Sequence, residues 1–229
     1  MLADFGSTYT KVSLVDPREG RLLARAEAPT TIESDLMEGY AAALGSARRS
    51  AGARLEPDYE LAASSAGGGL RVAAVGLVAD LTAAAARQAA LNAGARVGSV
   101  LAGNLDEDQL GELRSSRPEI VLFAGGTDGG QAELVLENAR RVASAGLPCH
   151  FVVACNTEVA AEAANLLGGG GAEVEIAGNV MPQLGQLEIE SAREAILRVF
   201  LQHVIGGKGL SASVGFAAMV KMPTPEAVL

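Results

Sequence analysis

The feature that most constrains the fold is a regular alternation of buried apolar runs and helix-like segments between residues 66 and 185. Strands buried on both faces read as continuous apolar runs, whereas amphipathic helices repeat their apolar residues every three to four positions. This alternation favours parallel strands joined by helical crossovers, so we expect a doubly wound parallel α/β unit. The predicted strands are 70–76, 97–102, 119–124, 150–154 and 173–177, and the predicted helices are 82–93, 106–116, 131–145 and 157–167, with a further helix over 190–205.

Residues with strong positional preferences mark the ends of several predicted helices. Asp106 and Thr157 are predicted N-caps, because a short polar side chain can accept a hydrogen bond from the first amides of a helix. Gly94 and Gly146 each follow an apolar-periodic segment, as expected for glycines that end helices. Pro148 prevents the helix before it from continuing.

Residues 1–65 show a different pattern, in which three short strands precede a helix. Residues 10–16 alternate in polarity, which is typical of a half-buried strand. Asp35 and Glu38 have the spacing of a capping box at the start of a helix. The predicted elements are a strand ending at Asp4, strands over 10–16 and 21–28 joined by a turn at 17–20, a helix over 36–50 that ends near Gly52, and a strand over 59–63.

The turn after the first predicted strand concentrates polar groups suited to a phosphate and its metal ion. Asp4 can hold a hydrated Mg²⁺, which keeps several waters and takes only one or two protein carboxylates. Gly6 permits a sharp turn close to phosphate oxygens. Ser7 and Thr8 supply amide and hydroxyl donors, and Lys11 adds a positive charge. The alternative interpretation is an ordinary hairpin with a glycine turn and a solvated lysine.

A glycine-rich loop is predicted between strand 119–124 and helix 131–145. Open α/β sheets usually bind ligands at the carboxyl ends of their strands, where helix N-termini also attract anions. One interpretation is a ligand or partner loop with Asp128 as its polar anchor, and the other is a tight turn whose glycines serve only backbone geometry. A weaker glycine-rich stretch at 64–69 is interpreted as a flexible crossover. The residues of the first loop are Gly125, Gly126, Thr127, Asp128, Gly129 and Gly130.

Composition excludes several classes of partner and bond. The 229 residues carry a formal net charge of −9, which argues against nucleic acid or an anionic membrane as the main partner. No apolar run reaches the roughly 18 residues of a membrane span and no charged leader precedes a cleavage site, so we expect a cytoplasmic protein. Cys149 and Cys155 would lie about 20 Å apart in one strand, too far for a disulfide.

Six sequence blocks, taken together and in order, resemble a known family. The segment from Asp4 to Lys11 resembles the first phosphate motif of actin-like ATPases. The full set resembles the MutL-type accessory, or reactivating, proteins of adenosylcobalamin-dependent glutamate (methylaspartate) mutase, which are unrelated to the mismatch-repair protein of that name. The blocks are ADFGSTYTKV at 3–12, APTTIESD at 28–35, SSAGGGLRVAAVGLV at 64–78, FAGGTDGG at 123–130, NVMPQLG at 179–185 and MPTPEAVL at 222–229.

The resemblance implies an α/β fold that combines an actin-like (ribonuclease H-like) nucleotide lobe with the doubly wound unit. Residues 1–65 would begin the nucleotide lobe, 66–185 would form the α/β unit, and 186–229 would be a helix and linker toward a second lobe that this chain lacks. ATP and Mg²⁺ are the implied cofactors, with Asp4 holding Mg²⁺ through water. The implied phosphate contacts come from Gly6, Ser7, Thr8 and Lys11. No general base can be named, and the oligomeric state stays open.

The resemblance further implies an ATP-dependent chaperone that opens a cobalamin-dependent mutase and releases damaged cobalamin. This chain would carry half of the nucleotide site. Two alternatives remain open at this point. One is a small-molecule kinase or hydantoinase-like ATPase of the same fold, and the other is a non-hydrolysing module that docks on the mutase through the α/β unit.

Overall fold

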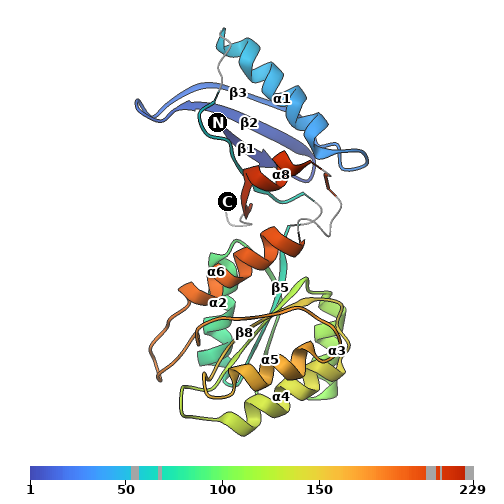
Figure 1. Ribbon diagram of the computed structural model, residues 1–229, viewed down its shortest axis with the longest axis vertical. Helices are drawn as coiled ribbons and strands as arrows, with labels where there is room; N and C mark the ends of the chain where they lie inside the picture. Colours follow the sequence, from blue (N-terminus) through green and yellow to red (C-terminus); the bar gives the residue numbers. More distant parts are fainter. Residues whose placement is uncertain (53–56, 67–68, 205–209, 212, 225–229) are drawn as a thin grey trace. The chain divides into compact units, whose positions relative to one another are not determined.

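The protein folds as two compact units, which we describe from a computed structural model. The structure describes residues 1–52, 57–66, 69–204, 210–211 and 213–224. The first unit consists of Met1–Gly69 with the described part of Phe200–Pro225, and the second contains Leu70–Val199. Figure 1 shows the course of the chain through each unit.

The first unit is built on a five-stranded mixed sheet with the order β10-β4-β1-β2-β3. Strands β1, β2 and β3 form the antiparallel meander that the sequence predicted. Strands β4 and β10 both run parallel to β1, so the carboxyl ends of these three strands share one edge. The strands are β1 (Leu2–Phe5), β2 (Tyr9–Asp16), β3 (Arg21–Pro29), β4 (Leu61–Ser64) and β10 (Val220–Pro223).

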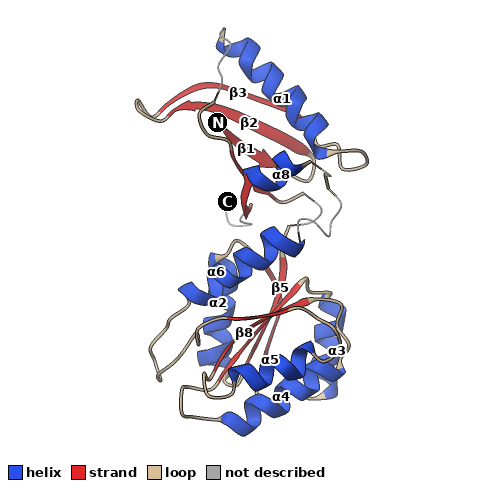
Figure 2. Cartoon of the chain, viewed as in Figure 1, coloured by secondary structure: helices blue, strands red, loops and turns tan. Residues whose placement is uncertain are grey.

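One helix, α1 (Leu36–Ala51), packs against β2 and β3 through a buried stripe with helical spacing that includes Tyr40 and Ala47 (Figure 2). The helix ends at Gly52 in the left-handed conformation, as predicted. Its start differs in detail from the predicted capping box, because Asp35 accepts from the Met37 amide while the Glu38 carboxylate accepts from the Ser34 hydroxyl. The aromatic core joins distant parts of the chain: the Phe5 ring meets that of Phe216, on the short helix α8 (Val214–Met219), edge to face at 4.9 Å.

The second unit contains a five-stranded, fully parallel sheet with the order β6-β5-β7-β8-β9. The chain moves to one side of β5 first and then to the other, which is the doubly wound order of flavodoxin. The predicted parallel α/β unit is therefore confirmed. The strands are β5 (Arg71–Gly76), β6 (Arg96–Ala102), β7 (Ile120–Gly125), β8 (His150–Cys155) and β9 (Val174–Ile176).

Helices cover both faces of this sheet. Helices α3, α4 and α5 enclose one core with side chains such as Leu113, Val142 and Ala163, while α2 and α6 pack together on the other face (Figure 1). The helical elements are the π-helical turn η1 (Ala79–Ala83), α2 (Ala84–Asn92), α3 (Glu107–Ser116), α4 (Ala132–Ser144), α5 (Ala160–Gly168) and α6 (Glu190–Val199), which continues as the π-helical turn η2 (Phe200–Val204) of the first unit.

Several predicted helix ends can be compared with the structure. Asp106 caps α3 in a capping box with Gln109, as its position predicted for an N-cap. The prediction that Thr157 is an N-cap is wrong: α5 begins after Val159, and the Thr157 amide instead donates to Asp128 on a neighbouring loop. The Thr157 side chain is hydrogen-bonded to Asp128 as well, so this residue connects two loops instead of capping α5.

The segment 186–229 contains regular elements that belong to both units. Helix α6 lies in the second unit, whereas β10 pairs with β4 and extends the sheet of the first. The predicted crossover at 64–69 falls partly outside the described residues, at 67 and 68, and residues 225–229 of the last family block also lie outside them.

Candidate functional site

The predicted phosphate turn is a tight connection between β1 and β2. The Gly6 amide donates to the Tyr9 carbonyl oxygen at 3.2 Å, which closes the turn. A β-carbon at Gly6 would lie 2.7 Å from that same backbone oxygen, so the position requires glycine. Ser7 and Thr8 are exposed at the tip. The turn therefore offers two hydroxyl groups to solvent from a backbone that has little freedom to change.

Asp4 and Lys11 face one another across the same hairpin. They are cross-strand partners, and the Lys11 Nζ lies 3.9 Å from the Asp4 Oδ2 with both side chains more than a third exposed. The other carboxylate oxygen, Oδ1, accepts a hydrogen bond of 2.8 Å from the Thr224 hydroxyl. The Asp4 carboxylate is thus oriented by a neighbour 220 residues away in sequence while its surface stays accessible.

The carboxyl ends of β1, β4 and β10 hold this arrangement together. The amides of Ser65 and Ala66 both donate to the Phe5 carbonyl oxygen, at 2.9 and 3.0 Å. The Thr224 amide donates to the Ser64 carbonyl oxygen at 2.9 Å. The structure therefore brings the five predicted residues to one edge and adds Thr224. Sequence reasoning missed Thr224 because four-residue β10 is too short to show a clear period.

A second hydroxyl network supports the turn from β3. The Thr30 hydroxyl donates to the Gly6 carbonyl oxygen at 2.9 Å and lies 3.1 Å from the hydroxyl of Thr10, which is fully buried. The Thr30 amide also donates to the Thr8 carbonyl oxygen. These bonds explain the role of Thr30 in the block at 28–35, which the sequence could only associate with a family.

This edge has the donor set for a hydrated divalent cation and an anion. One partly exposed carboxylate fits Mg²⁺, which keeps most of its waters and needs few protein ligands. Hydroxyl groups and a nearby lysine fit phosphate oxygens. Asp4, Ser7, Thr8 and Lys11 are therefore chemically suited to the groups that the sequence suggested.

The glycine-rich loop of the second unit lies between β7 and α4. Gly125, Gly126 and Gly129 have positive φ angles of 136°, 71° and 72°, which other residues rarely adopt. A β-carbon at Gly125 would lie 2.7 Å from the Leu77 side chain, and one at Gly130 would lie 2.6 Å from the Thr127 hydroxyl oxygen. Backbone geometry therefore accounts for most of these glycines.

Asp128 ties three loops together at the carboxyl edge of the sheet. Its Oδ1 accepts from the Thr157 amide at 3.0 Å and from the Asn179 side-chain amide at 2.9 Å. Burial by itself would raise the pKa of Asp128, but the hydrogen bonds from Asn179 and Thr157 outweigh it and lower the pKa below its ordinary value. The carboxylate is therefore charged at neutral pH and joins the loops that follow β7, β8 and β9.

A cavity of about 610 Å³ opens beside this loop, which we call the switch-point pocket. It lies where the chain order of the sheet reverses between β5 and β7, the usual ligand position in doubly wound folds. The lining is mainly aliphatic, with Thr82, Thr127, Gln131 and Glu133 as its polar side chains. The aliphatic contributors are Leu77, Val78, Leu81, Leu134, Met181 and Leu184.

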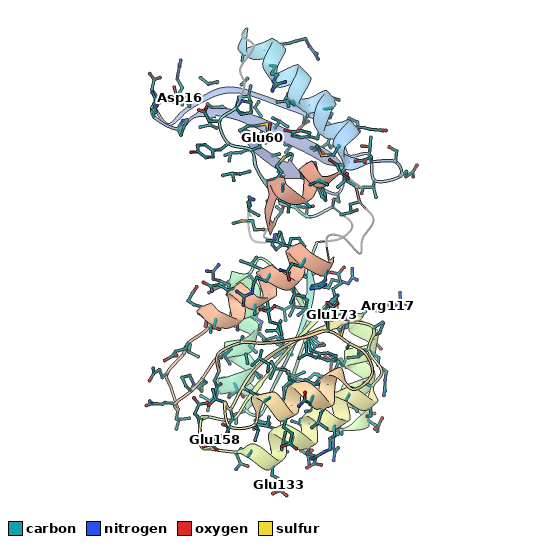
Figure 3. All side chains as sticks on the ribbon, in the orientation of Figure 1. Asp16, Glu60, Arg117, Glu133, Glu158 and Glu173 are labelled. Atoms are coloured by element: carbon teal, nitrogen blue, oxygen red, sulfur yellow. The ribbon has the colours of Figure 1, made fainter. Side chains whose placement is uncertain are left out.

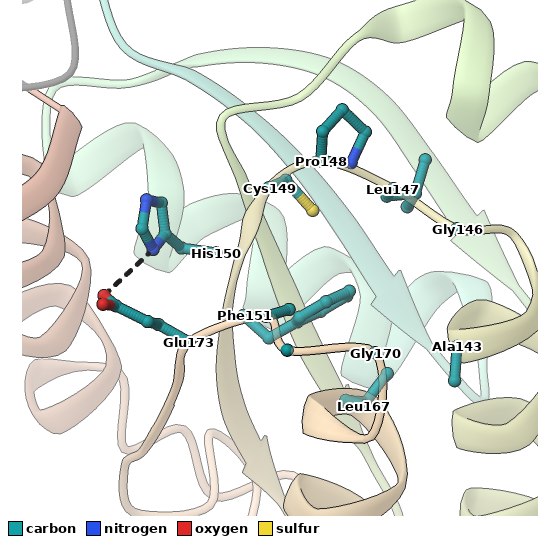
Figure 4. A pocket seen from close by; sticks show the side chains of 12 residues that line it. Ala143, Gly146, Leu147, Pro148, Cys149, His150, Phe151, Leu167, Gly170 and Glu173 are labelled. Carbon is teal, nitrogen blue, oxygen red and sulfur yellow. Dashed lines mark ion pairs between the residues drawn. The ribbon is translucent and has the colours of Figure 1, made fainter.

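A second cavity of about 560 Å³ lies at the opposite, amino edge of the sheet. Figure 4 shows His150 and Glu173 at its rim, with the His150 Nδ1 3.5 Å from the Glu173 Oε2. Cys149 also lines it, but burial raises the pKa of this thiol to about 12, so it is protonated at neutral pH.

Cys149 and Cys155 are both free, as the sequence predicted. Ligands of doubly wound sheets bind at the carboxyl edge, so the switch-point pocket is the stronger candidate.

Among the described residues, no helix is both long and apolar enough to cross a lipid bilayer.

Comparison with known proteins assigns a family. The family model described as MutL protein matches residues 1–229. A curated relative, Protein MutL from Clostridium tetanomorphum, is 42% identical over 230 residues. The alignment covers 100% of this chain and 50% of that relative, so the chain spans about half the length of the curated relative that it matches.

Proposed function

The chain belongs to the MutL protein family, and we propose that it supplies one part of the nucleotide site of an ATP-dependent chaperone that reactivates a cobalamin-dependent mutase. The mutase would be of the glutamate (methylaspartate) mutase type. The observation that carries the proposal is the Asp4 carboxylate, held between Lys11 and Thr224 beside an exposed turn that requires glycine.

The strand arrangement of the first unit supports an actin-like lobe. A three-stranded antiparallel meander is extended by two strands parallel to the first, and the polar turn lies at their shared carboxyl edge. This is the layout expected of a ribonuclease H-like nucleotide lobe. The carboxyl edge of parallel strands is also where α/β proteins gather catalytic and binding groups.

Each polar group at the edge has a proposed task. Asp4 holds Mg²⁺ through its water shell, and Thr224 orients the carboxylate by donating to Oδ1. The exposed hydroxyl groups of Ser7 and Thr8 bind phosphate oxygens, with Gly6 keeping the backbone tight. Lys11 offsets phosphate charge. When bound, Mg²⁺ would neutralise part of the triphosphate charge.

The small number of polar groups at the proposed nucleotide site limits the ATP binding and hydrolysis that we expect of this chain alone. The proposed site has one carboxylate and one lysine and lies on partly exposed side chains, so it does not exclude water from a bound nucleotide. We therefore expect weak MgATP binding and negligible hydrolysis by this chain. Steady turnover would contradict the view that it carries only part of the site.

A matched pair of lysine variants tests the proposal. Lys11→Ala should weaken binding of a fluorescent ATP analogue by about 1.5–3 kcal/mol, the range for a hydrogen bond to a charged group. Lys221→Ala is the control, because Lys221 lies exposed on β10 and its Nζ donates to the Ala218 carbonyl oxygen. Equal affinities for wild type and Lys11→Ala would reassign Lys11 to an ordinary hairpin.

A further inference from the structure

We propose that the switch-point pocket is a docking site for a protein segment that carries an aliphatic or aromatic side chain beside lysine or arginine residues. The inference uses only residues of the second unit and stands apart from the proposed nucleotide site. Its evidence is a cavity, an exposed leucine on an ordered turn, and the charge around them.

The cavity has the size and lining of a recognition pocket. Its volume of about 610 Å³ falls within the range of ligand pockets. Its floor is aliphatic: Leu77 is 9% exposed and Met181 is 2% exposed, so both are part of the packed core. The π-helical turn η1, which precedes α2, is held by Thr82, whose hydroxyl oxygen accepts from the amides of Leu77 and Val78 at 2.8 and 3.0 Å. The floor of the pocket is therefore preformed in the absence of a partner.

Leu184 lines the pocket and is nevertheless 76% exposed. It sits at the tip of a tight turn closed by a 3.0 Å hydrogen bond from the Gln186 amide to the Gln183 carbonyl oxygen. Gly185, with a φ of 80°, takes the position in this turn that favours glycine. A further hydrogen bond from the Glu188 amide to the Val180 carbonyl oxygen anchors the segment to the core. The fold thus presents an aliphatic side chain to solvent on a defined backbone.

The exposed aliphatic surface extends beyond the cavity. Val78 is 49% exposed and lines the pocket, and Leu187, which follows the Leu184 turn, is 48% exposed. Apolar side chains gathered at a pocket mark interaction sites, whereas single ones are ordinary on protein surfaces. A pocket for one anchoring side chain, bordered by further apolar contact area, fits a protein segment better than a small molecule.

The charges around the pocket decide which segment fits. Glu133 lines the cavity, and Asp80 and Asp128 lie between residues that line it. The Glu158 carboxylate approaches the glycine-rich loop, 3.9 Å from the place of a β-carbon on Gly129. Figure 3 shows Glu133 and Glu158 on the same side of the unit. All four carboxylate side chains belong to exposed residues.

No base offsets these acids within the segments that form the pocket and its rim. Lysine, arginine and histidine are absent from the sequence of 76–82, 125–134, 156–159 and 178–188. An anionic ligand would meet Glu133 in the first turn of α4, where the helix N-terminus would otherwise attract it. The rim therefore disfavours phosphates and acidic segments and complements lysine or arginine.

Three short synthetic peptides of equal length test the proposal by fluorescence anisotropy. The first places leucine and phenylalanine between lysines, the second replaces the lysines by glutamates, and the third replaces the apolar residues by serines. We expect the first peptide to bind this chain at least about ten-fold more tightly than either of the others, because an anchor and its complementary charge act together. Binding of the first should weaken steeply with added salt.

Matched variants locate the binding. Leu184→Ser should weaken the first peptide about ten-fold, and Glu133→Gln should reduce the salt dependence. Leu91→Ser is the control, because Leu91 is 43% exposed on α2 of the same unit and does not line the pocket. Leu184 is solvent-exposed, so its variant should keep the wild-type thermal midpoint. Equal binding of the acidic peptide, no binding of the first peptide, or unchanged affinity in Leu184→Ser would each overturn the proposal.

Discussion

Each unit has a glycine-containing turn at the carboxyl end of a parallel strand, but the polar groups beside the two turns have different partners. In the first unit, Ser7 and Thr8 face solvent and Lys11 lies beside the single carboxylate. In the second, the Asp128 carboxylate is occupied by hydrogen bonds from other loops, and the surrounding charge is acidic. The first turn closes an antiparallel hairpin, whereas the second leads from a strand into a helix. Their ligands depend on the side chains that neighbouring strands bring to the edge.

The largest expected effect follows from removing the glycine of the first turn. Gly6→Ala forces a β-carbon against a backbone oxygen that cannot move without opening the hairpin, so we expect a loss of about 1–3 kcal/mol in the free energy of unfolding. Binding of the ATP analogue should be lost with it. Urea denaturation measures the first effect. Gly111→Ala on α3, where a β-carbon meets nothing within 4 Å, is the control and should not destabilise. Full stability and binding in Gly6→Ala would remove the geometric basis of the first site.

A smaller loss is expected when the tie between loops is cut in the second unit. Asp128→Ala should lower the free energy of unfolding by about 1–1.5 kcal/mol, since the lost hydrogen bonds are charge-assisted but exposed to solvent. Asp128→Asn should lose less, because an amide oxygen can accept from the same donors. Binding of the ATP analogue should not change in either variant. This result would show that the Asp128 loop of the second unit and the proposed nucleotide site of the first unit act independently.

The pH dependence of this loss has a definite sign. Folding lowers the pKa of Asp128, so its contribution to stability is complete above the unfolded-state pKa of about 4 and disappears as the pH falls through the lower folded-state pKa. The difference between wild type and Asp128→Ala should therefore be constant near neutral pH and shrink in acid. If this difference grows in acid, the folded protein does not hold Asp128 as a hydrogen-bonded carboxylate with a lowered pKa.

The affinity of the chain for a mutase can be compared between variants at the carboxyl edges of the two sheets. If the second unit docks on a cobalamin-dependent mutase, the chain should bind the purified mutase without nucleotide. Asp128→Ala should then weaken the complex several-fold more than Asp4→Ala, because Asp128 organises the rim of the switch-point pocket while Asp4 lies in the other unit. Surface plasmon resonance gives both dissociation constants. Equal affinities would return the Asp128 loop to a purely structural role.

The smallest effect is expected at the thiols of the second unit. Burial raises the pKa of both Cys149 and Cys155 to about 12, and both side chains are largely inaccessible. A thiol reagent should therefore react slowly with the native chain at neutral pH and rapidly after denaturation. Rapid labelling of the folded protein would show that this unit opens at low energetic cost.

Much of the local structure follows from short-range signals in the sequence. The alternation in β2 places Val12 and Leu14 in the core, and Asp106 and Gly52 mark helix ends where the structure has them. The sequence predicts one helix over 190–205, but residues 200–204 form a π-helical turn assigned to the other unit, and residue 205 lies outside the described residues. Side-chain period and capping act within a few residues, so one sequence suffices to read them, whereas a change of unit depends on distant packing.

The candidate site likewise has residues that local sequence could identify and residues that only tertiary contacts bring to it. Asp4, Gly6, Ser7, Thr8 and Lys11 could be proposed together because one hairpin contains them all. Thr224 reaches Asp4 only because β10 pairs with β4, and Leu184 becomes a candidate contact only because its turn lies beside the cavity. Thr157 carried a local capping signal that was overridden by Asp128 from another loop.

The sequence by itself determined most of the strand and helix segments, although not α8 or β10, together with the parallel character of the second sheet, the free cysteines and the polar turn after β1. Tertiary structure alone decided the strand order, the partner of β10, the hydrogen bond between Thr224 and Asp4, and the acidic rim around an aliphatic pocket. The physical reason is the distance along the sequence over which each kind of interaction acts. Backbone propensity and burial period are properties of neighbouring residues, but strand pairing and side-chain convergence depend on which buried surfaces fit together after the whole chain has collapsed.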